Sequence, residues 1–141
     1  MARPSWDAYF MQLCRDVATR ASCTRKHCGA VIVRHNRVVS TGYNGSLPGI
    51  KHCEEVGCDV VDNHCVRTVH AEQNAIYIAA KYGNALDGAT IYCTTFPCWN
   101  CAKAIISAGI KEIVYEDHYN PDQRVLDACV YLNIVIKQYI E

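Results

Sequence analysis

Three features are missing from this sequence of 141 residues, and each absence argues against a class of protein. No apolar run approaches the roughly 20 residues that a membrane-spanning helix needs. No apolar stretch followed by small residues stands at the N-terminus, so we find no secretory signal and expect an intracellular protein. No net charge remains, because Lys+Arg and Asp+Glu both number 14, and this lowers the expectation of a basic face for nucleic acid.

Internal repeats, linkers and low-complexity tracts are also missing. The length fits one compact domain over residues 1–141 and is too short for two ordinary ones. Half of the residues are apolar, which is enough to bury a proper core.

Cysteine, in contrast, is abundant, with ten residues. A long, core-rich chain without a secretory signal favours metal ligation or catalysis over disulfides for several of them. Cys14, Cys93 and Cys129 lie in apolar periodic segments and are expected to be inert core residues.

Hydrophobic periodicity predicts an α/β fold. Helices are expected over residues 5–20, 70–83, 97–109 and 121–132, a hairpin of two strands over 29–44, and further strands over 89–95, 111–117 and 134–140. The hairpin should turn at His35 and Asn36. Alternation of strands and helices after a hairpin implies a mixed sheet with helices on both faces. Residues 45–66 are rich in Gly, Cys and His without periodicity, which predicts a long, irregular and functional loop.

Two short motifs carry the chemistry, and both fall at predicted helix starts. The first is His70-Ala71-Glu72, and the second is Pro97-Cys98-Trp99-Asn100-Cys101. A helix N-terminus lowers thiol pKa values and favours thiolate ligands. Two cysteines three residues apart reach one metal ion together. His70 would be the third ligand, which leaves a fourth position open for water, as in catalytic zinc sites.

Glu72 then has a clear task as a proton shuttle between the water and the leaving group. Each part has an ordinary structural explanation: a helix-capping histidine, a redox cysteine pair, a first-turn carboxylate. The combination is far more specific, because H-x-E followed by P-C-x-x-C is the signature of zinc deaminases.

The whole chain resembles the deoxycytidylate (dCMP) deaminases of bacteria and phages, within the cytidine deaminase superfamily. The resemblance runs through "SWDAYFM", "GAVIVR", "STGYNGSLPG", "HCVRTVHAEQNAI" and "FPCWNCAKAIISAGIKEIVY". It implies a three-layer α/β/α cytidine deaminase-like fold around a five-stranded mixed sheet. The implied reaction is the hydrolysis of dCMP to dUMP and ammonia, which supplies dUMP for thymidylate synthesis. The implied location is the cytoplasm, or the host cytoplasm if a phage encodes the chain.

The resemblance also implies substrate contacts. Asn44 and Ser46 would approach the nucleoside, the backbone of Ala71 the base carbonyl and that of Phe96 the exocyclic amine. Tyr119 would lie near the substrate phosphate. As bare sequence features, Asn44 could equally be a turn residue and Tyr119 an exposed aromatic.

A second, structural zinc ion is common in the family. Cys23, Cys53 and His64 match its ligand positions best, and Cys58 is the expected fourth ligand. Cys65 and His52 remain alternatives for that fourth position. A closed four-ligand site would attach the 45–66 loop to the first hairpin. Such ordering of the loop is also expected to position His70.

Members of the family are typically homohexamers, activated by dCTP and inhibited by dTTP, and Mg²⁺ could accompany a triphosphate effector. Three cations near the hairpin could meet phosphates, although a solvated surface is the more common explanation for each: Arg25, Lys26 and Arg34. Two alternatives stay open. One is a zinc deaminase acting on another nucleotide, base or nucleoside or on tRNA adenosine, and the other is a non-catalytic zinc scaffold.

Overall fold

The computed structural model describes residues 2–141 and consists of a central sheet, five helices and two small strand pairs. The elements in chain order are α1 (Trp6–Ala18), β1 (Gly29–Arg34), β2 (Arg37–Tyr43), β3 (Gly45–Ser46), α2 (Cys53–Val56), β4 (Val60–Val61), β5 (His64–Cys65), β6 (Thr68–Val69), α3 (Ala71–Lys81), β7 (Thr90–Thr95), α4 (Trp99–Ser107), β8 (Glu112–Asp117), α5 (Gln123–Tyr131) and β9 (Val135–Gln138).

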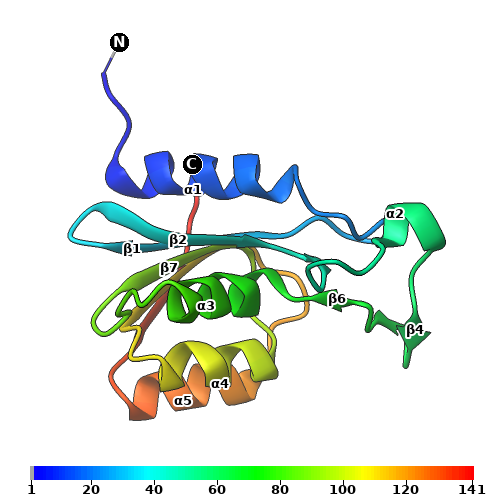
Figure 1. Ribbon diagram of the computed structural model, residues 1–141. Helices are drawn as coiled ribbons and strands as arrows, with labels where there is room; N and C mark the ends of the chain where they lie inside the picture. Colours follow the sequence, from blue (N-terminus) through cyan, green and yellow to red (C-terminus); the bar gives the residue numbers. More distant parts are fainter. Residues whose placement is uncertain (1) are drawn as a thin grey trace.

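The central sheet is mixed, with strand order β2-β1-β7-β8-β9. The β2–β1 and β1–β7 pairs are antiparallel, whereas β7, β8 and β9 run parallel. Figure 1 shows α1 on one face of this sheet and α3, α4 and α5 on the other. The predicted three-layer architecture is therefore confirmed.

Strand β1 explains why both faces of the sheet are covered. Its side chains alternate between two cores, as successive residues of a strand point to opposite faces. Ala30 and Ile32 belong to the large core beneath α3 and α4. Val31 and Val33 belong to the smaller core beneath α1. Both sets are buried, so the strand reads as a continuous apolar run.

The first hairpin turns where the sequence predicts. His35 and Asn36 both have positive φ angles, 52° and 57°. A two-residue turn of this kind matches the right-handed twist of the paired strands. The hairpin places Cys28 and Asn44, which flank its two strands, at the same end of the sheet.

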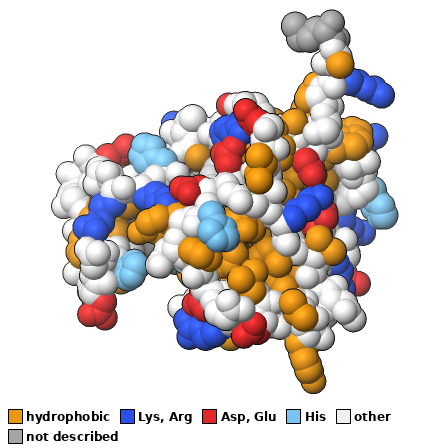
Figure 2. Space-filling view, turned by 180° about the vertical axis from the view of Figure 1, so that it is seen from behind, with side chains coloured by type: hydrophobic (Ala, Val, Ile, Leu, Met, Phe, Trp, Pro, Cys, Tyr) orange, Lys and Arg blue, Asp and Glu red, His pale blue; other side chains and the backbone are white. Residues whose placement is uncertain are grey.

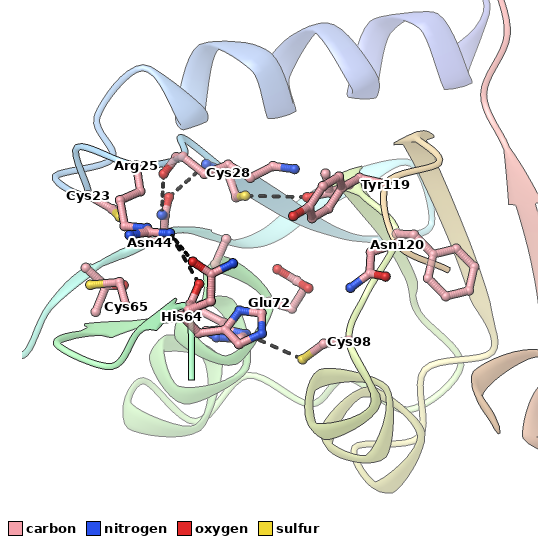
Figure 3. A pocket seen from close by; sticks show the side chains of 17 residues that line it. Cys23, Arg25, Cys28, Asn44, His64, Cys65, Glu72, Cys98, Tyr119 and Asn120 are labelled. Atoms are coloured by element: carbon pink, nitrogen blue, oxygen red, sulfur yellow. Dashed lines mark hydrogen bonds between the residues drawn. The ribbon is translucent and has the colours of Figure 1, made fainter. Parts of the chain in front are cut away.

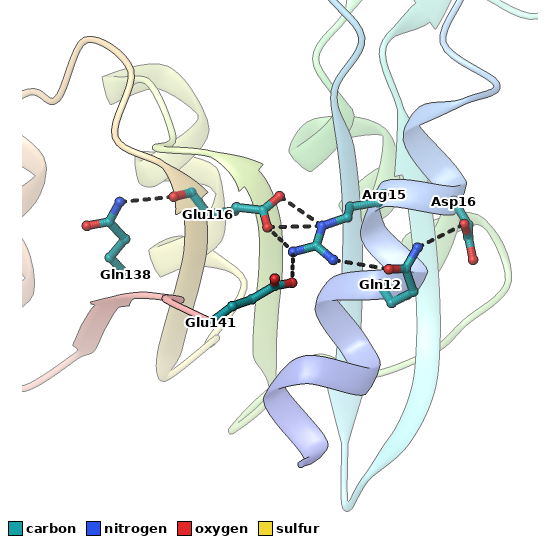
Figure 4. Close-up of polar contacts among 6 residues, drawn as sticks. All are labelled: Gln12, Arg15, Asp16, Glu116, Gln138 and Glu141. Atoms are coloured by element: carbon teal, nitrogen blue, oxygen red, sulfur yellow. Dashed lines mark hydrogen bonds and ion pairs between the residues drawn. The ribbon is translucent and has the colours of Figure 1, made fainter. Parts of the chain in front are cut away.

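Helix α1 is also joined to strand β8 and to the C-terminal residue by one guanidinium group (Figure 4). Arg15 donates hydrogen bonds to Glu116 at the end of β8, to Glu141 at 2.8 Å and to Gln12 at 3.1 Å. The Glu116 carboxylate raises the pKa of Arg15 above its ordinary value. The contacts are partly exposed, so they fix orientation more than they add stability.

Residues 45–66 are more ordered than the sequence indicates. Strand β3 pairs with β6, helix α2 forms a single turn, and β4 and β5 form a small hairpin. The expectation of a wholly irregular loop is wrong, because elements of two to four residues are too short to show periodicity. Figure 1 shows α2 and β4 projecting beyond one end of the central sheet.

Among the described residues, no helix has the length and apolar character required to cross a membrane.

Candidate active site

The first motif lies at the N-terminus of α3, which packs closely on β2. His70 is the residue immediately before the helix, in an extended conformation. The helix is held by the Ser40 hydroxyl, which donates to the carbonyl of Ala75 at 2.6 Å, and by the Asn74 amide, which donates to the carbonyl of Tyr43 at 2.8 Å. These contacts fix the start of α3, and with it His70 and Glu72, relative to the sheet.

The second motif lies at the N-terminus of α4. Cys98 is the N-cap, and its thiol accepts a hydrogen bond from the backbone N–H of Cys101 at 3.4 Å. The helix therefore begins at Trp99, two residues after the predicted start at Pro97. Both metal-binding motifs thus end in the first turn of a helix, where free N–H groups favour thiolates.

The structure brings the three predicted ligands together. The Nδ1 atom of His70 lies 3.2 Å from Sγ of Cys101 and 3.5 Å from Sγ of Cys98. All three ligand atoms lie within 4.8 Å of one another. A tetrahedral zinc ion, with bonds of about 2.0 Å to nitrogen and 2.3 Å to sulfur, holds such atoms roughly 3.5–3.8 Å apart. The three residues therefore fit zinc.

Electrostatics in this cluster favour one thiolate. A hydrogen bond from the Cys101 thiol, with a further one from His70, lowers the pKa of Cys98 to about 4. The pKa of Cys101 is raised, chiefly because it shares that hydrogen bond with Cys98. The same Cys98 sulfur raises the pKa of His70. Metal ligation favours the deprotonated form of all three groups.

Glu72 is a buried carboxyl group beside the metal ligands. Its side chain is 7% exposed, and burial raises its pKa above the ordinary value. A carboxyl with a raised pKa is suited to taking up and releasing a proton near neutral pH. Figure 3 shows Glu72 among the residues that line one pocket, close to Cys98.

The pocket is a cavity of about 440 Å³ with two different ends. The inner end contains His70, Glu72 and Cys98. The outer end contains two cationic side chains, Arg25 and Lys26, together with His64. Glu72 is the one carboxylate among the described residues that line it. One end therefore suits metal-assisted proton transfer, and the other suits an anion.

Most of the expected substrate contacts lie at this cavity. Asn44, Ala71, Phe96 and Tyr119 all line it. Ser46 does not: its hydroxyl is buried and has no hydrogen-bond partner among residues 2–141. Ser46 lies in β3 opposite Thr68, so the fold directs this residue into the β3–β6 pair.

Asn44 already uses both ends of its amide. Its Oδ1 accepts from the backbone N–H of Cys28 at 2.8 Å, and its Nδ2 donates to the carbonyl of Lys26 at 2.7 Å. The side chain therefore fixes the backbone that carries Lys26 and Cys28. One N–H of the amide group remains for a ligand, because a primary amide has two.

Several lining residues were not identified from the sequence as parts of this site: Cys28, Asn63, Thr95 and Asn120. The thiol of Cys28 lies 3.4 Å from Oγ1 of Thr95, and both residues line the cavity. Asn63 and Asn120 both have positive φ angles, so they read as ordinary turn residues.

A second cluster of four cysteines lies beside the outer end of the cavity: Cys23, Cys53, Cys58 and Cys65. The Sγ atoms of Cys23 and Cys58 are 3.9 Å apart, and those of Cys53 and Cys65 are 3.7 Å apart. These distances exclude disulfides and match the roughly 3.8 Å between sulfurs on a tetrahedral zinc ion. The four residues therefore fit zinc as well.

His64 is not a member of this cluster; the structure groups Cys65, the alternative from the sequence, with the three predicted cysteines Cys23, Cys53 and Cys58. His64 lines the cavity, and His52 contacts the hydroxyl of Ser22 at 2.7 Å. Burial alone would raise the pKa of Cys65, but backbone N–H groups of Arg67, Thr68 and Asp59 lower it to about 6. Such N–H groups stabilise a thiolate, the form that binds metal.

Residues 4–117 match the family model described as the cytidine and deoxycytidylate deaminase zinc-binding region. The chain is 36% identical to deoxycytidylate deaminase of Mycobacterium phage D29, over 82% of this chain and 97% of that protein. This chain belongs to the cytidine and deoxycytidylate deaminase family. The two zinc-compatible clusters and the buried glutamate are therefore found in a deaminase fold.

Other members of the deaminase family are similar over different lengths. ComE operon protein 2 of Bacillus subtilis is 49% identical over 84% of this chain. This chain spans 63% of that protein and less than half of some other relatives. The structure of dCMP deaminase from cyanophage S-TIM5 in complex with dCMP and dUMP superposes with a TM-score of 0.84 and 26% identity. That comparison covers 99% of this chain and 100% of the cyanophage chain.

Proposed function

We propose that this chain catalyses the zinc-dependent hydrolysis of dCMP to dUMP and ammonia. The observation that carries the proposal is a single cavity that joins a zinc-compatible triad and Glu72 to a cationic outer end. Family membership and the likeness to a deaminase structure determined with dCMP and dUMP support it. Because the substrate is a soluble nucleotide, we place the reaction in the cytoplasm, where the product would supply thymidylate synthesis.

The residues of the inner end would act on the base. Zinc, held by His70, Cys98 and Cys101, would supply a Lewis acid that activates water at neutral pH. Glu72 would take a proton from that water and deliver it to N3 of cytosine as the hydroxyl adds to C4. It would then carry the proton of the new C4 hydroxyl to the amine, so that the C4–N bond breaks, ammonia leaves and the C4 carbonyl of dUMP forms. The burial of Glu72 keeps bulk water away from these transfers. The backbone of Ala71 and Phe96 would bind the edge of the base.

The outer end would distinguish a nucleotide from a nucleoside. Arg25 and Lys26 lie side by side in the chain, and both line the cavity. The Lys26 ammonium group lies 3.6 Å from the centre of the Tyr119 ring. Charged hydrogen bonds from these groups to a 5′-phosphate would contribute about 1.5–3 kcal/mol each. A free nucleoside lacks the phosphate and would bind correspondingly less tightly.

The four-cysteine cluster would hold a second, structural zinc ion. Its sulfur separations and the thiolate-stabilising N–H groups around Cys65 support this assignment. A closed four-ligand site would hold together the segments that contain residues 23, 53, 58 and 65.

Oligomerisation and regulation are further parts of the proposal. The chain would assemble into a hexamer, be activated by dCTP, with Mg²⁺ on the triphosphate, and be inhibited by dTTP. Figure 2 shows hydrophobic side chains gathered on the lower half of the face seen from behind. Helix α5 ends with Val130 and Tyr131 exposed at 77% and 88% of their surfaces. Exposed apolar surface of this kind favours association between copies.

The deciding experiment is the ultraviolet absorbance change of dCMP, with deoxycytidine measured beside it, in protein of known zinc content. Rapid loss of dCMP and almost no loss of deoxycytidine supports the proposal. No loss of either compound, in zinc-loaded protein and with dCTP present, would contradict it. The next substrates to assay would then be other nucleotides and tRNA adenosine.

A further inference from the structure

The small hairpin of β4 and β5 forms one wall of the cavity at its outer end. Its two-residue turn, Asp62 and Asn63, has positive φ angles of 50° and 64°. Asn63 and His64 line the same cavity as the metal triad and Glu72. Figure 3 shows His64 pointing into the space in front of Glu72.

The base of this hairpin is held by the four-cysteine cluster. Cys58 precedes β4 and Cys65 lies in β5, opposite Val60. The Cys58 thiol also contacts the hydroxyl of Thr24 at 3.3 Å. Two of the four cysteines therefore attach the hairpin to segments elsewhere in the chain. A hairpin of two residues per strand has little stability of its own, so these attachments fix its position.

Two side chains of the 23–28 segment, Arg25 and Lys26, extend from it in different directions at the outer end of the cavity. The Arg25 guanidinium donates to the backbone carbonyl of Asn63 at 3.2 Å and to its Oδ1 at 3.3 Å. The neighbouring Lys26 reaches the other way, to the Tyr119 ring and to Asp117 at 4.0 Å. Both side chains therefore span the outer end of the cavity, one toward Asn63 and the other toward Tyr119.

The outer surface of this region is acidic. Four exposed carboxylates lie in α2 and the hairpin: Glu54, Glu55, Asp59 and Asp62. None of them forms an ion pair with any residue in the described range 2–141. Lys51 is the single lysine or arginine in the 51–62 segment. The hairpin thus presents the polar residues Asn63 and His64 to the cavity and the exposed carboxylates Asp59 and Asp62 to solvent.

We propose that the cysteine-anchored hairpin is a specificity element that admits free nucleotides and excludes cytosine within a polynucleotide strand. A target base in a strand carries backbone on both its 5′ and 3′ sides. That backbone would have to cross the Arg25–Asn63 bridge and then pass the unpaired carboxylates, which repel each phosphate. A mononucleotide ends at its phosphate, which Arg25 and Lys26 would bind, and carries no backbone that continues past the bridge to the carboxylates.

This inference rests on the proposed deaminase function, and its test has a readout that does not depend on turnover. The probe is a single-stranded oligodeoxynucleotide of thymidines with one central deoxycytidine, labelled for fluorescence anisotropy and analysed for deamination by mass spectrometry. A triple variant removes three carboxylates without changing side-chain size: Glu54→Gln, Asp59→Asn and Asp62→Asn. A matched control removes three carboxylates elsewhere: Asp16→Asn, Asp127→Asn and Glu141→Gln.

A second variant, Asn63→Gly, removes the side-chain half of the bridge and keeps the positive φ angle of the turn. The triple variant should bind the oligonucleotide about tenfold more tightly than wild type, because it lacks three carboxylates that repel the phosphates. The difference should be greatest at low salt, where this repulsion is screened least. The control should bind it as wild type does. Combining the triple variant with Asn63→Gly should raise the ratio of kcat/KM for the oligonucleotide to that for dCMP.

Two results would overturn the inference. One is wild-type deamination of the oligonucleotide at a rate comparable to that of dCMP. The other is equal oligonucleotide affinity in the wild-type, triple-variant and control proteins, all shown to be folded and zinc-loaded. Wild-type protein that leaves dCMP unchanged contradicts the proposed function instead, and the anisotropy comparison then still tests the hairpin.

Discussion

Gly42 of β2 and Ala71 of α3 are so close that a Cβ atom on the glycine would stand 2.3 Å from the carbonyl oxygen of the alanine. The same Cβ would stand 2.4 Å from the backbone nitrogen of Ala75. Both neighbours are helix backbone, so the helix itself would have to move. Since His70 and Glu72 flank Ala71, the spacing between strand and helix also sets the position of the active site.

Gly42→Ala should therefore lower both stability and kcat. Overpacking of this kind costs about 1–3 kcal/mol. The matched control is Gly29→Ala, whose Cβ would stand 2.3 Å from the carbonyl oxygen of Cys14 in α1, on the opposite face. Both variants should show a lower Tm, but only Gly42→Ala should reduce kcat per folded, zinc-loaded chain. Wild-type kcat in Gly42→Ala would show that this contact does not position the site.

Glu72→Gln should abolish turnover without unfolding the protein. The amide has nearly the same shape but cannot shuttle a proton, so kcat should fall by about 10²–10⁴-fold. Burial already disfavours the charged carboxylate, as its raised pKa indicates, and a neutral amide should therefore leave Tm unchanged or slightly higher. Zinc content by elemental analysis should equal that of wild type. A variant that keeps its turnover would remove Glu72 from the mechanism.

Arg25→Gln and Lys26→Gln should each raise KM for dCMP and leave the weak reaction with deoxycytidine unaffected. Loss of one charged hydrogen bond to phosphate corresponds to about 10- to 100-fold in KM. Arg34→Gln is the matched control, because the Arg34 guanidinium donates to the carbonyl of Ala85 at 2.6 Å and does not line the cavity. Steady-state kinetics with both substrates provide the comparison. An equal effect of all three changes would count against a phosphate subsite at Arg25 and Lys26.

Cys65→Ser should release one zinc ion per chain, whereas His64→Ala should release none. The reason is that Cys65 belongs to the four-cysteine cluster and His64 lines the cavity. Metal content and protease sensitivity of the 45–66 segment are the measurements. Cys65→Ser should be cleaved faster there, because the hairpin loses an anchor. The reverse pattern of zinc loss would restore the ligand set expected from the sequence.

The sequence predicts the fold well where segments are long and periodic. The hairpin over 29–44 and the long helices follow from apolar spacing and from turn residues such as Asn36 and Gly109, both of which have positive φ angles. The metal triad was predictable because His70 and the two cysteines lie in short motifs at helix starts. The structure places these ligands together as that pattern suggests.

The second cluster could not be assigned in the same way. Cys23, Cys53 and Cys58 agree with the predicted set, but the choice between His64 and Cys65 does not follow from local spacing. His64 and Cys65 are neighbours in β5, where successive side chains point to opposite sides. Sequence alone cannot tell which neighbour points to the cluster until the turn at Asp62 and Asn63 is known. Tertiary contacts likewise decide the position of Ser46, which pairs with Thr68.

The pairing of β3 with β6 has a consequence for how this protein can change over time. Gly45 pairs with Val69 and Ser46 with Thr68, so the two ends of the segment between Ser46 and Thr68 are held side by side. Residues between these pairs can be gained or lost at an entropic cost that grows only with the logarithm of their number. A lineage can thus exchange this whole excursion, and with it the cavity wall that Asn63 and His64 provide, while the β3–β6 pair keeps Val69, the residue before His70, in place.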